Sequence, residues 1–291
     1  MSEQLSIIND IELRKQISAW LAEDVGSGDI TTLTTIPKNI ASKAVIHAKE
    51  AGVLAGIKIA ELVFHTVDPT LVFTAFKKDG EQVAAGTIIA EVEGSVHHLL
   101  TGERLALNLL QRMSGVATKT KMFVDALQGL PVRLVDTRKT TPGHRALEKY
   151  AVRVGGGANH RFGLYDAVMI KDNHIKGAGS ITAAVQSARA NIPHTMKIEV
   201  EAETLDQVQE ALAAGADIIM LDNMSNITMT EAVRVIKQTS PHVIVEASGG
   251  VTLETIYDMA KTGIDVISVG SLTYSFHSID ISLDLFEKKG G

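Results

Sequence analysis

The second half of the chain alternates short apolar runs with longer amphipathic segments. The runs lie at 132–135, 167–170, 197–200, 217–221, 243–247 and 265–269. Between them lie segments such as "LDQVQEALAAG", whose apolar residues recur at helical spacing and end at the stop signal Gly215. Apolar strands that alternate with helices predict a parallel sheet covered by helices. The regular repeat favours an α/β barrel over a doubly wound sheet.

The residues before 115 follow a different pattern. "KAVIHAKEAGVLAGIKIAELVF" predicts a strand, a glycine turn and a helix, and "LVFTAFKKDGEQVAAGTIIAEVEGSV" alternates with period two, as hairpins do. These patterns predict a smaller α/β domain with an antiparallel sheet. A helix over 101–115 is expected to join the two halves. Its polar face, which the pattern alone assigns to solvent, carries Arg104, Asn108, Gln111 and Arg112.

Charged, polar or glycine-rich residues accompany the end of every apolar run in the second half. They are Asp136-Thr137-Arg138-Lys139, Lys171-Asp172-Asn173-His174, Glu199 with Glu201, Asp222-Asn223, Ser248-Gly249-Gly250 and Gly270-Ser271. In a parallel barrel the carboxyl ends of the strands open on one face, where such folds place their active sites. The pattern therefore predicts a ligand site on this face.

Positive charge gathers between residues 138 and 176, although the chain has a net charge of −6. Within this window, Arg145, Lys149 and Arg153 repeat every four residues and are interpreted as an exposed helix face. The remaining cations at strand ends, or after the flexible "GGGANH", predict a local anion site. They are Arg138, Lys139, Arg161 and Lys171. Arginine suits bidentate contacts to carboxylate or phosphate, whereas lysine acts as a point charge.

Acids and glycines on the same face suit the same kind of ligand. Glu201 and Asp222 are candidate ligands of a magnesium ion shared with substrate phosphates, or they neutralise Lys171. The glycines after the last two strands let backbone N–H groups approach a phosphate.

Composition excludes several other classes of protein. At 291 residues the chain is long enough for two domains, and it contains no cysteine, so disulfides and thiolate chemistry are excluded. The mild acidity argues against general nucleic-acid binding, and no apolar run approaches the ~20 residues of a membrane span. The start lacks the pattern of a secretory signal, so a cytoplasmic protein is expected. The chain also has no P-loop, dinucleotide-binding, G-x-S-x-G or H-E-x-x-H motif.

Several motifs together resemble one family. "GERLALNLLQRMSG", "DTRKTTPGHRALEKYAV", "GGGANHRFGLYDAVMIKDNHI", "IEVEAET", "ADIIMLDNM" and "EASGGVT" closely resemble quinolinate phosphoribosyltransferase (decarboxylating). The likeness runs from "LAEDVGSGDITT" to "ISVGSLTYS", and "DTRKTTPG" with "KDNH" at this spacing is its most specific part. One position departs from the family, which usually has histidine where this chain has Tyr274.

The resemblance implies a fold and a reaction. The implied fold is an N-terminal α/β sandwich over residues 1–113 and an incomplete, seven-stranded, TIM-like α/β barrel over 114–275, with 276–291 returning to the first domain. The residues show six strands clearly, so one more is expected. The implied reaction joins quinolinate to phosphoribosyl pyrophosphate with Mg²⁺, releasing pyrophosphate and carbon dioxide and giving nicotinate mononucleotide for NAD synthesis. The implied assembly is a homodimer or homohexamer, in which Arg104 reaches a neighbouring site rather than solvent.

The resemblance also implies roles for individual residues. Quinolinate contacts are expected from Arg104 of a neighbour and from Arg138, His160, Arg161 and Lys171. The pyrophosphate, ribose and magnesium group is expected at Lys139, Glu201 and Asp222, with Thr137 beside it. The 5′-phosphate is expected at Ser248, Gly249, Gly250, Val269, Gly270 and Ser271.

Three alternatives remain open. The first is a related phosphoribosyltransferase that uses another aromatic acceptor. The second is a Schiff-base aldolase with Lys171 as the nucleophile. The third is a phosphosugar sensor without catalysis.

Overall fold

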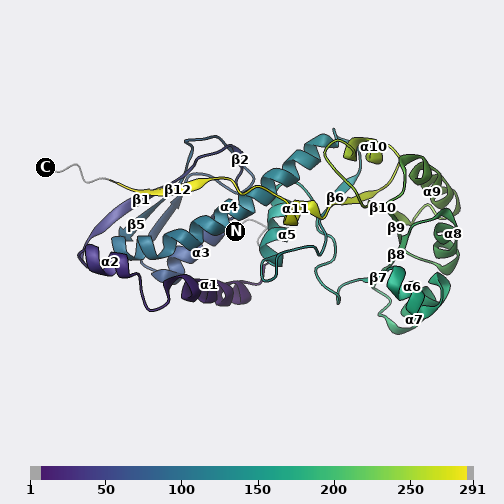
Figure 1. The fold of residues 1–291 in the computed structure, drawn as a ribbon, viewed down its shortest axis with the longest axis horizontal. Helices are drawn as coiled ribbons and strands as arrows, with labels where there is room; N and C mark the ends of the chain where they lie inside the picture. The colour runs from purple at the N-terminus through teal and green to yellow at the C-terminus, as the bar shows by residue number, and fades with distance from the viewer. Residues whose placement is uncertain (1–7, 287–291) are drawn as a thin grey trace. The chain divides into compact units, whose positions relative to one another are not determined.

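The chain folds into two compact units. A computed structural model describes residues 8–286. The first unit contains residues 1–121, 146–156 and 275–291, and the second contains residues 122–145 and 157–274. Each unit has its own sheet and its own core (Figure 1). The domain limits expected from the sequence, at 113 and 275, stay a prediction.

The first unit is built on an antiparallel sheet in the order β12–β1–β5–β3. Its strands are β1 (Ala41–Ala48), β3 (Val72–Ala75), β5 (Ile88–Ser95) and β12 (Ile281–Leu285). Alternate side chains point to opposite faces of a sheet. Register pairs Ile46 with Ala90 on one side and with Leu283 on the other, and all three are buried. The other face carries polar pairs such as Lys43 with Glu91.

Helices of the first unit begin where the sequence supplies a cap. The Asn9 side chain accepts the first amide hydrogens of α1 (Asp10–Val25), and the Asp29 side chain caps α2 (Ile30–Thr35). The predicted strand, glycine turn and helix correspond to β1, the short β2 (Gly52–Val53) and α3 (Ile57–Val67). In the predicted hairpin region β3 pairs with β5, whereas β4 (Gln82–Val83) pairs with β2.

The helix predicted over 101–115 is much longer, because α4 runs from Val96 to Ala126. Gly115 does not end it. A Cβ at Gly115 would lie 2.2 Å from the carbonyl oxygen of His277, so the glycine instead lets the C-terminal segment cross the helix closely. This explains why a Ser-Gly pair stands in the middle of a helix.

The interpretation of Arg145, Lys149 and Arg153 as one exposed face is wrong for two of the three. They lie on α5 (Arg145–Val154), and only Arg153 is exposed. Lys149 is fully buried, and Arg145 is half-buried. Polar partners elsewhere in the first unit explain the burial of this helix: Glu148 pairs with Arg112 at 2.5 Å, and the Tyr150 hydroxyl donates to Asp79 at 2.5 Å.

The second unit contains the predicted parallel sheet, and all six apolar runs are strands. Among residues 8–286 it has six strands in the order β6–β11–β10–β9–β8–β7. A single parallel bridge joins Val135 at the end of β6 to Ala158, on the side of β6 away from β11. The segment around Ala158 therefore lies where a seventh strand would stand, reduced to one bridge. The strands are β6 (Arg133–Val135), β7 (Val168–Ile170), β8 (Ile198–Ala202), β9 (Ile218–Asp222), β10 (Ile244–Ser248) and β11 (Val266–Ser268).

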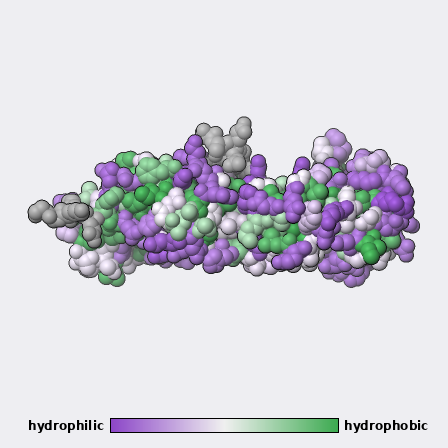
Figure 2. Space-filling model, turned by 90° about the horizontal axis from the view of Figure 1, so that it is seen from above, coloured by the Kyte–Doolittle hydropathy of each residue, from purple (hydrophilic) through white to green (hydrophobic). Residues whose placement is uncertain are grey.

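Helices follow each of the last five strands, and α6, α7, α8 and α9 lie along the outside of the curved sheet (Figure 1). The outer surface over α8 and α9 is predominantly hydrophilic (Figure 2). None of the helices within residues 8–286 combines the length and the apolar character needed to cross a membrane. The helices are α6 (Asp172–Ala178), α7 (Ile181–Asn191), α8 (Leu205–Ala214), α9 (Asn226–Thr239), α10 (Ile256–Ala260) and α11 (Ser271–Tyr274).

The crossing at Gly115 gives a stability prediction. Gly115→Ala should destabilise the protein by about 1–3 kcal/mol, because the new methyl group meets backbone atoms that cannot rotate away. This loss exceeds the ~1 kcal/mol that alanine gains over glycine in a helix. Gly177→Ala in α6 is the control, since a Cβ there meets no atom of residues 8–286 within 4 Å. Thermal unfolding followed by circular dichroism measures both variants, and a Gly115→Ala protein as stable as Gly177→Ala would contradict the packing argument.

Candidate active site

Strand register places the predicted acids and glycines at one edge of the second sheet. Glu201 pairs with Met220, and Asp222, two residues further along β9, pairs with Ser248. Paired residues on neighbouring parallel strands point to the same face, and so do residues two apart. Glu201, Asp222 and Ser248 therefore share one face at the carboxyl ends of β8, β9 and β10.

Lys171 follows β7 directly and is held from two directions. Its ammonium forms an ion pair with Glu201 at the end of the neighbouring β8. Its backbone N–H donates to Nδ1 of His174 at 3.0 Å, which fixes the start of α6. The Lys171 side chain is 42% exposed and that of Glu201 is 12% exposed. Of the two charges in this ion pair, the Lys171 ammonium is therefore the one more accessible to a ligand.

Arg138 and Arg161 bring two positive charges close together. Burial lowers the pKa of the Arg161 guanidinium, and the charge of Arg138 lowers it further. Nε of Arg138 is buried and has no hydrogen-bond partner among residues 8–286. The charges of Glu199 and Asp166 act on Arg161 in the opposite direction, but two like charges close together remain costly and an anion relieves them. The pair therefore favours an anionic ligand, and two carboxylates on one planar acid would match two guanidinium groups.

A buried aspartate holds the loop that carries the second arginine. Asp136 directly follows β6 and is completely buried. It accepts the backbone N–H of His160 at 2.9 Å and the side-chain amide of Asn159 at 2.7 Å. Together with the backbone bridge from Val135 to Ala158, these bonds fix residues 158–160 against the end of β6.

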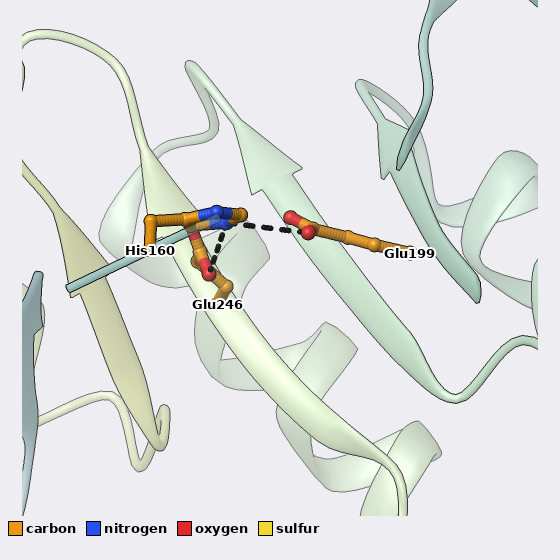
Figure 3. A group of neighbouring side chains, drawn as sticks. All are labelled: His160, Glu199 and Glu246. Atoms are coloured by element: carbon orange, nitrogen blue, oxygen red, sulfur yellow. Dashed lines mark ion pairs between the residues drawn. The ribbon is translucent and has the colours of Figure 1, made fainter. Parts of the chain in front are cut away.

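His160 points between two buried glutamates (Figure 3). Its Nε2 lies 3.2 Å from Glu199 on β8 and 3.5 Å from Glu246 on β10. Burial alone would lower the pKa of His160, but hydrogen bonds to and the charges of the two glutamates outweigh it and raise the pKa to about 10. Burial in turn raises the pKa of Glu199. Nδ1 of His160 accepts the Arg161 backbone N–H at 2.7 Å, so Nε2 is the ring nitrogen that faces the carboxylates as a donor.

The glycine-rich ends of β10 and β11 form tight backbone turns. Gly249 and Gly250 have φ angles of +93° and +61°, which glycine adopts readily. A Cβ at Gly249 would lie 2.1 Å from Asn223 Oδ1, so a larger residue does not fit there. At the next strand, a Cβ at Gly270 would lie 2.9 Å from Lys139 and 3.4 Å from Thr137. Gly249 and Gly270 are thus packed closely by neighbouring side chains, whereas a Cβ at Gly250 would meet no atom of residues 8–286 within 4 Å.

The remaining predicted residues are placed as follows. Val269 is buried and donates its N–H to the carbonyl of Val135, whereas Ser271 is half-buried at the start of α11. Thr273 donates to the carbonyl of Lys139, so the ends of β6 and β11 are tied together. Arg104 lies in the first unit, exposed on α4.

The polar face predicted around Arg104 is only partly solvated. Gln111 donates to the carbonyl of Ile281 on β12 at 2.8 Å, and Arg112 pairs with Glu148. Only Arg104 and Asn108 are exposed.

Two buried polar residues of the site and one half-buried residue were not assigned a role from the sequence. They are Glu246, Asp136 and Asn159. A signal for Glu246 was present, because "VIVEAS" and "KIEVEA" each place a glutamate inside an apolar strand, where an unpaired charge is costly. No comparable signal marks Asn159, whose partner Asp136 lies 23 residues away.

Comparisons with known proteins cover most of the chain. Residues 29–114 match the family described as quinolinate phosphoribosyl transferase, N-terminal domain, and residues 116–284 match its C-terminal domain. A probable nicotinate-nucleotide pyrophosphorylase [carboxylating] of Synechocystis is 48% identical over 92% of this chain and 91% of its own length. A protein of Bacillus subtilis with the same description is 46% identical over 96% of this chain and 95% of its own length.

Solved structures agree with this fold. The crystal structure of NadC from Streptococcus pyogenes has a TM-score of 0.90 at 43% identity, covering 96% of this chain and 99% of that one. The nicotinate-nucleotide pyrophosphorylase from Francisella tularensis has a TM-score of 0.91 at 38% identity, covering 98% of this chain and 100% of that one.

Proposed function

This chain belongs to the quinolinate phosphoribosyl transferase family, and we propose that it joins quinolinate to phosphoribosyl pyrophosphate with decarboxylation. The products are nicotinate mononucleotide, pyrophosphate and carbon dioxide, so the reaction supplies a precursor of NAD. The observation that carries this proposal is that the charge of Arg138 acts on the Arg161 guanidinium, together with a buried Arg138 Nε that has no partner within residues 8–286. Quinolinate carries two carboxylates on one flat ring and can form an ion pair with each guanidinium group.

We assign the acceptor end of the site to the cations around β6 and β7. Arg138, Arg161 and Lys171 supply charge to the two carboxylates, and His160 lies beside them. These groups lie at strand ends, on a rigid sheet, so the pyridine nitrogen can be held in line with the reacting ribose carbon. No nucleophilic side chain is needed for this chemistry.

We assign the phosphate end to the glycine turns and the acids. Backbone N–H groups of Ser248–Gly250 and of Gly270–Ser271 would hold the 5′-phosphate, with Thr137 and Lys139 next to Gly270 toward the pyrophosphate. The N–H predicted at Val269 is already bonded to the carbonyl of Val135, so Val269 would line the site without donating. Glu201 and Asp222 offer carboxylate oxygens on neighbouring strands, the donor type and number that Mg²⁺ takes when it binds mainly through substrate phosphates. The residues present therefore fit Mg²⁺, which when bound would neutralise charge on the pyrophosphate.

The proposed reaction balances without an oxidant or reductant. The pyridine nitrogen uses its lone pair to bond to ribose C1, and the bond from C1 to the pyrophosphate oxygen breaks with its electron pair leaving on oxygen. Lys139 stabilises that departing charge, while Glu201 or Asp222 favours positive charge on the ribose. The ring is now cationic, so it accepts the electron pair of the bond to the 2-carboxylate as carbon dioxide leaves. A proton then replaces the carboxylate on the ring.

The alternatives fit this site less well. A Schiff-base aldolase needs a free amine in a desolvated pocket, whereas Lys171 is ion-paired with Glu201. A phosphoribosyltransferase for a monocarboxylate acceptor such as nicotinate would need fewer cations than Arg138, Arg161 and Lys171 provide. The net charge of −6 argues against a broad basic surface for nucleic acid or membrane, and we propose a cytoplasmic location.

The direct test is an assay with quinolinate, phosphoribosyl pyrophosphate and Mg²⁺, in which nicotinate mononucleotide is detected by chromatography and mass. We expect one carbon dioxide per nucleotide formed. Product from nicotinate but none from quinolinate would identify the related transferase instead. Binding of both substrates without product would identify a sensor.

Arg138→Ala should weaken quinolinate more than phosphoribosyl pyrophosphate. Truncating one partner of a buried charge pair costs about 2–5 kcal/mol, which is roughly 30-fold to several thousand-fold in affinity. Calorimetry with each ligand separately measures the two losses. Arg153→Ala is the control from the same basic window, because its exposed side chain should matter to neither ligand. Equal weakening of both ligands by Arg138→Ala would contradict the assignment.

We further propose a homodimer or homohexamer in which Arg104 acts in the site of a neighbouring copy. Arg104→Ala and Lys171→Ala should each be nearly inactive yet melt cooperatively like wild type. When the two variants exchange subunits, half of randomly paired dimers contain one intact site, so activity should recover to about a quarter of wild type per chain. Mass spectrometry verifies the exchange. Mixed dimers without recovered activity would place Arg104 in its own chain's site or outside any site.

A further inference from the structure

Two buried glutamates lie in the second sheet behind the proposed acceptor site. Glu199 and Glu246 are 2% and 3% exposed, and each sits inside a strand, β8 or β10. One carboxylate oxygen of each faces Nε2 of His160 (Figure 3). The other oxygen of each is buried without a hydrogen-bond partner among residues 8–286. Such burial of two acids is costly, so it needs a function that offsets the cost.

The geometry of the His160 ring links these acids to Arg161. Nδ1 of His160 accepts the backbone N–H of Arg161 at 2.7 Å, so the ring hydrogen is on Nε2, where both carboxylates can accept it. The ring is therefore held at both nitrogens. Its plane and position determine where the Arg161 backbone lies.

Arg138 repels the Arg161 side chain, while the charges of Glu199 and Asp166 favour its charged form. At its far end, Arg161 donates to the carbonyl of Ala167 at 3.0 Å and to the sulfur of Met169 at 3.6 Å. A guanidinium has five N–H donors, so three remain for a ligand. Before the ligand binds, Arg161 must stay beside the like charge of Arg138. Its side chain is better ordered there if its backbone is fixed.

We propose that Glu199 and Glu246 are positioning residues, which fix His160 and through it hold Arg161 ready for a carboxylate of the acceptor. The inference rests on the proposed function, because quinolinate is the ligand that Arg161 would meet. Neither glutamate is expected to touch the substrate. The two glutamates should affect the affinity for quinolinate and leave the affinity for phosphoribosyl pyrophosphate unchanged.

A metal ion held by the same three side chains is the competing interpretation, since their ligand atoms lie within 4.8 Å of one another. A metal bound at Nε2 needs the lone pair of that nitrogen, which moves the ring hydrogen to Nδ1. That hydrogen would then face the Arg161 N–H, which already points at Nδ1. The hydrogen bond from Arg161 therefore favours the positioning role.

The test compares two double variants of the same pair of residues. Glu199→Met with Glu246→Met keeps the volume but removes every acceptor, whereas Glu199→Gln with Glu246→Gln keeps one acceptor oxygen on each side chain. We expect the Met pair to raise the KM for quinolinate about tenfold or more, with the KM for phosphoribosyl pyrophosphate within about twofold of wild type. Its melting temperature should equal or exceed that of wild type, because uncharged residues replace buried charges. The Gln pair should recover most of the quinolinate affinity.

A third comparison shows whether the glutamates act through the histidine. In a His160→Ala background, the Met pair should change the quinolinate KM by less than about twofold. The glutamates act through His160, so once the histidine is absent their replacement should add little to the loss. His160→Gln replaces His160→Ala if the latter fails to fold, because its amide can still donate to both glutamates while lacking an acceptor near the Arg161 N–H.

Several results would overturn the proposal. The first is a Met pair whose KM for quinolinate equals that of wild type. The second is a Met pair that raises the KM for both substrates equally. The third is a Met pair that raises the KM for quinolinate as much in the His160→Ala background as in wild type. A melting temperature that falls on treatment with EDTA in wild type but not in the Met pair would establish the metal site instead. Wild-type protein that makes no product from quinolinate, although it folds, would contradict the proposed function and this inference with it. Additive losses in an active enzyme would contradict this inference alone.

Discussion

The repulsion between Arg138 and Arg161 is the constraint on which the rest of the site depends. Two guanidinium groups are held near each other at the end of one sheet, and burial of Arg161 strengthens their mutual effect. The protein tolerates this arrangement because the charges of Glu199 and Asp166 act against the repulsion and neighbouring groups hold Arg161 in place. Asp136 fixes the loop before Arg161, and the carbonyl of Ala167 anchors its side chain. We propose that an acid with two carboxylates relieves this repulsion and is selected for that reason.

Topology explains how residues far apart in the chain reach this site. A parallel sheet brings every strand to the same edge with the same polarity, so the residues after each strand become neighbours. Register then decides which side chains face one another, as when Glu201 pairs with Met220 and Asp222 with Ser248. The cations come from the ends of β6 and β7 and from the loop between them. The glycine turns come from β10 and β11. The acceptor and phosphate ends of the proposed site thus arise from different strands of one sheet.

Much of this architecture could be predicted from the sequence, for a physical reason. Strands buried on both faces are apolar along their whole length, so all six runs were identifiable as strands of the second unit among residues 8–286. The segment around Ala158 gives no such signal, because "GGGANH" has no apolar run and contributes one bridge only. The length of α4 was also missed. Gly115 is typical of a helix end in sequence, and its close approach to His277 appears only in three dimensions.

The interior of the site was harder to predict than its rim. Charged residues at strand ends are visible in sequence, but whether a charge is buried depends on partners elsewhere. Lys149 repeats with two other cations at helical spacing and yet is fully buried, while Glu246 looks like an interruption of a strand and faces His160. The roles proposed for the site residues, for Mg²⁺ and for the neighbour's Arg104 stay predictions.

The central claim is that paired cations select a dicarboxylate, and a comparison of three ligands tests it most directly. Isothermal calorimetry would compare pyridine-2,3-dicarboxylate with the 2- and 3-monocarboxylates on the wild-type protein. Arg138 and Arg161 are half-buried, and removing one partner of a charge pair that the bound ligand desolvates costs about 2–5 kcal/mol. The account therefore predicts that the dicarboxylate binds at least about 30-fold more tightly than either monocarboxylate. Equal affinity for the three acids would contradict it.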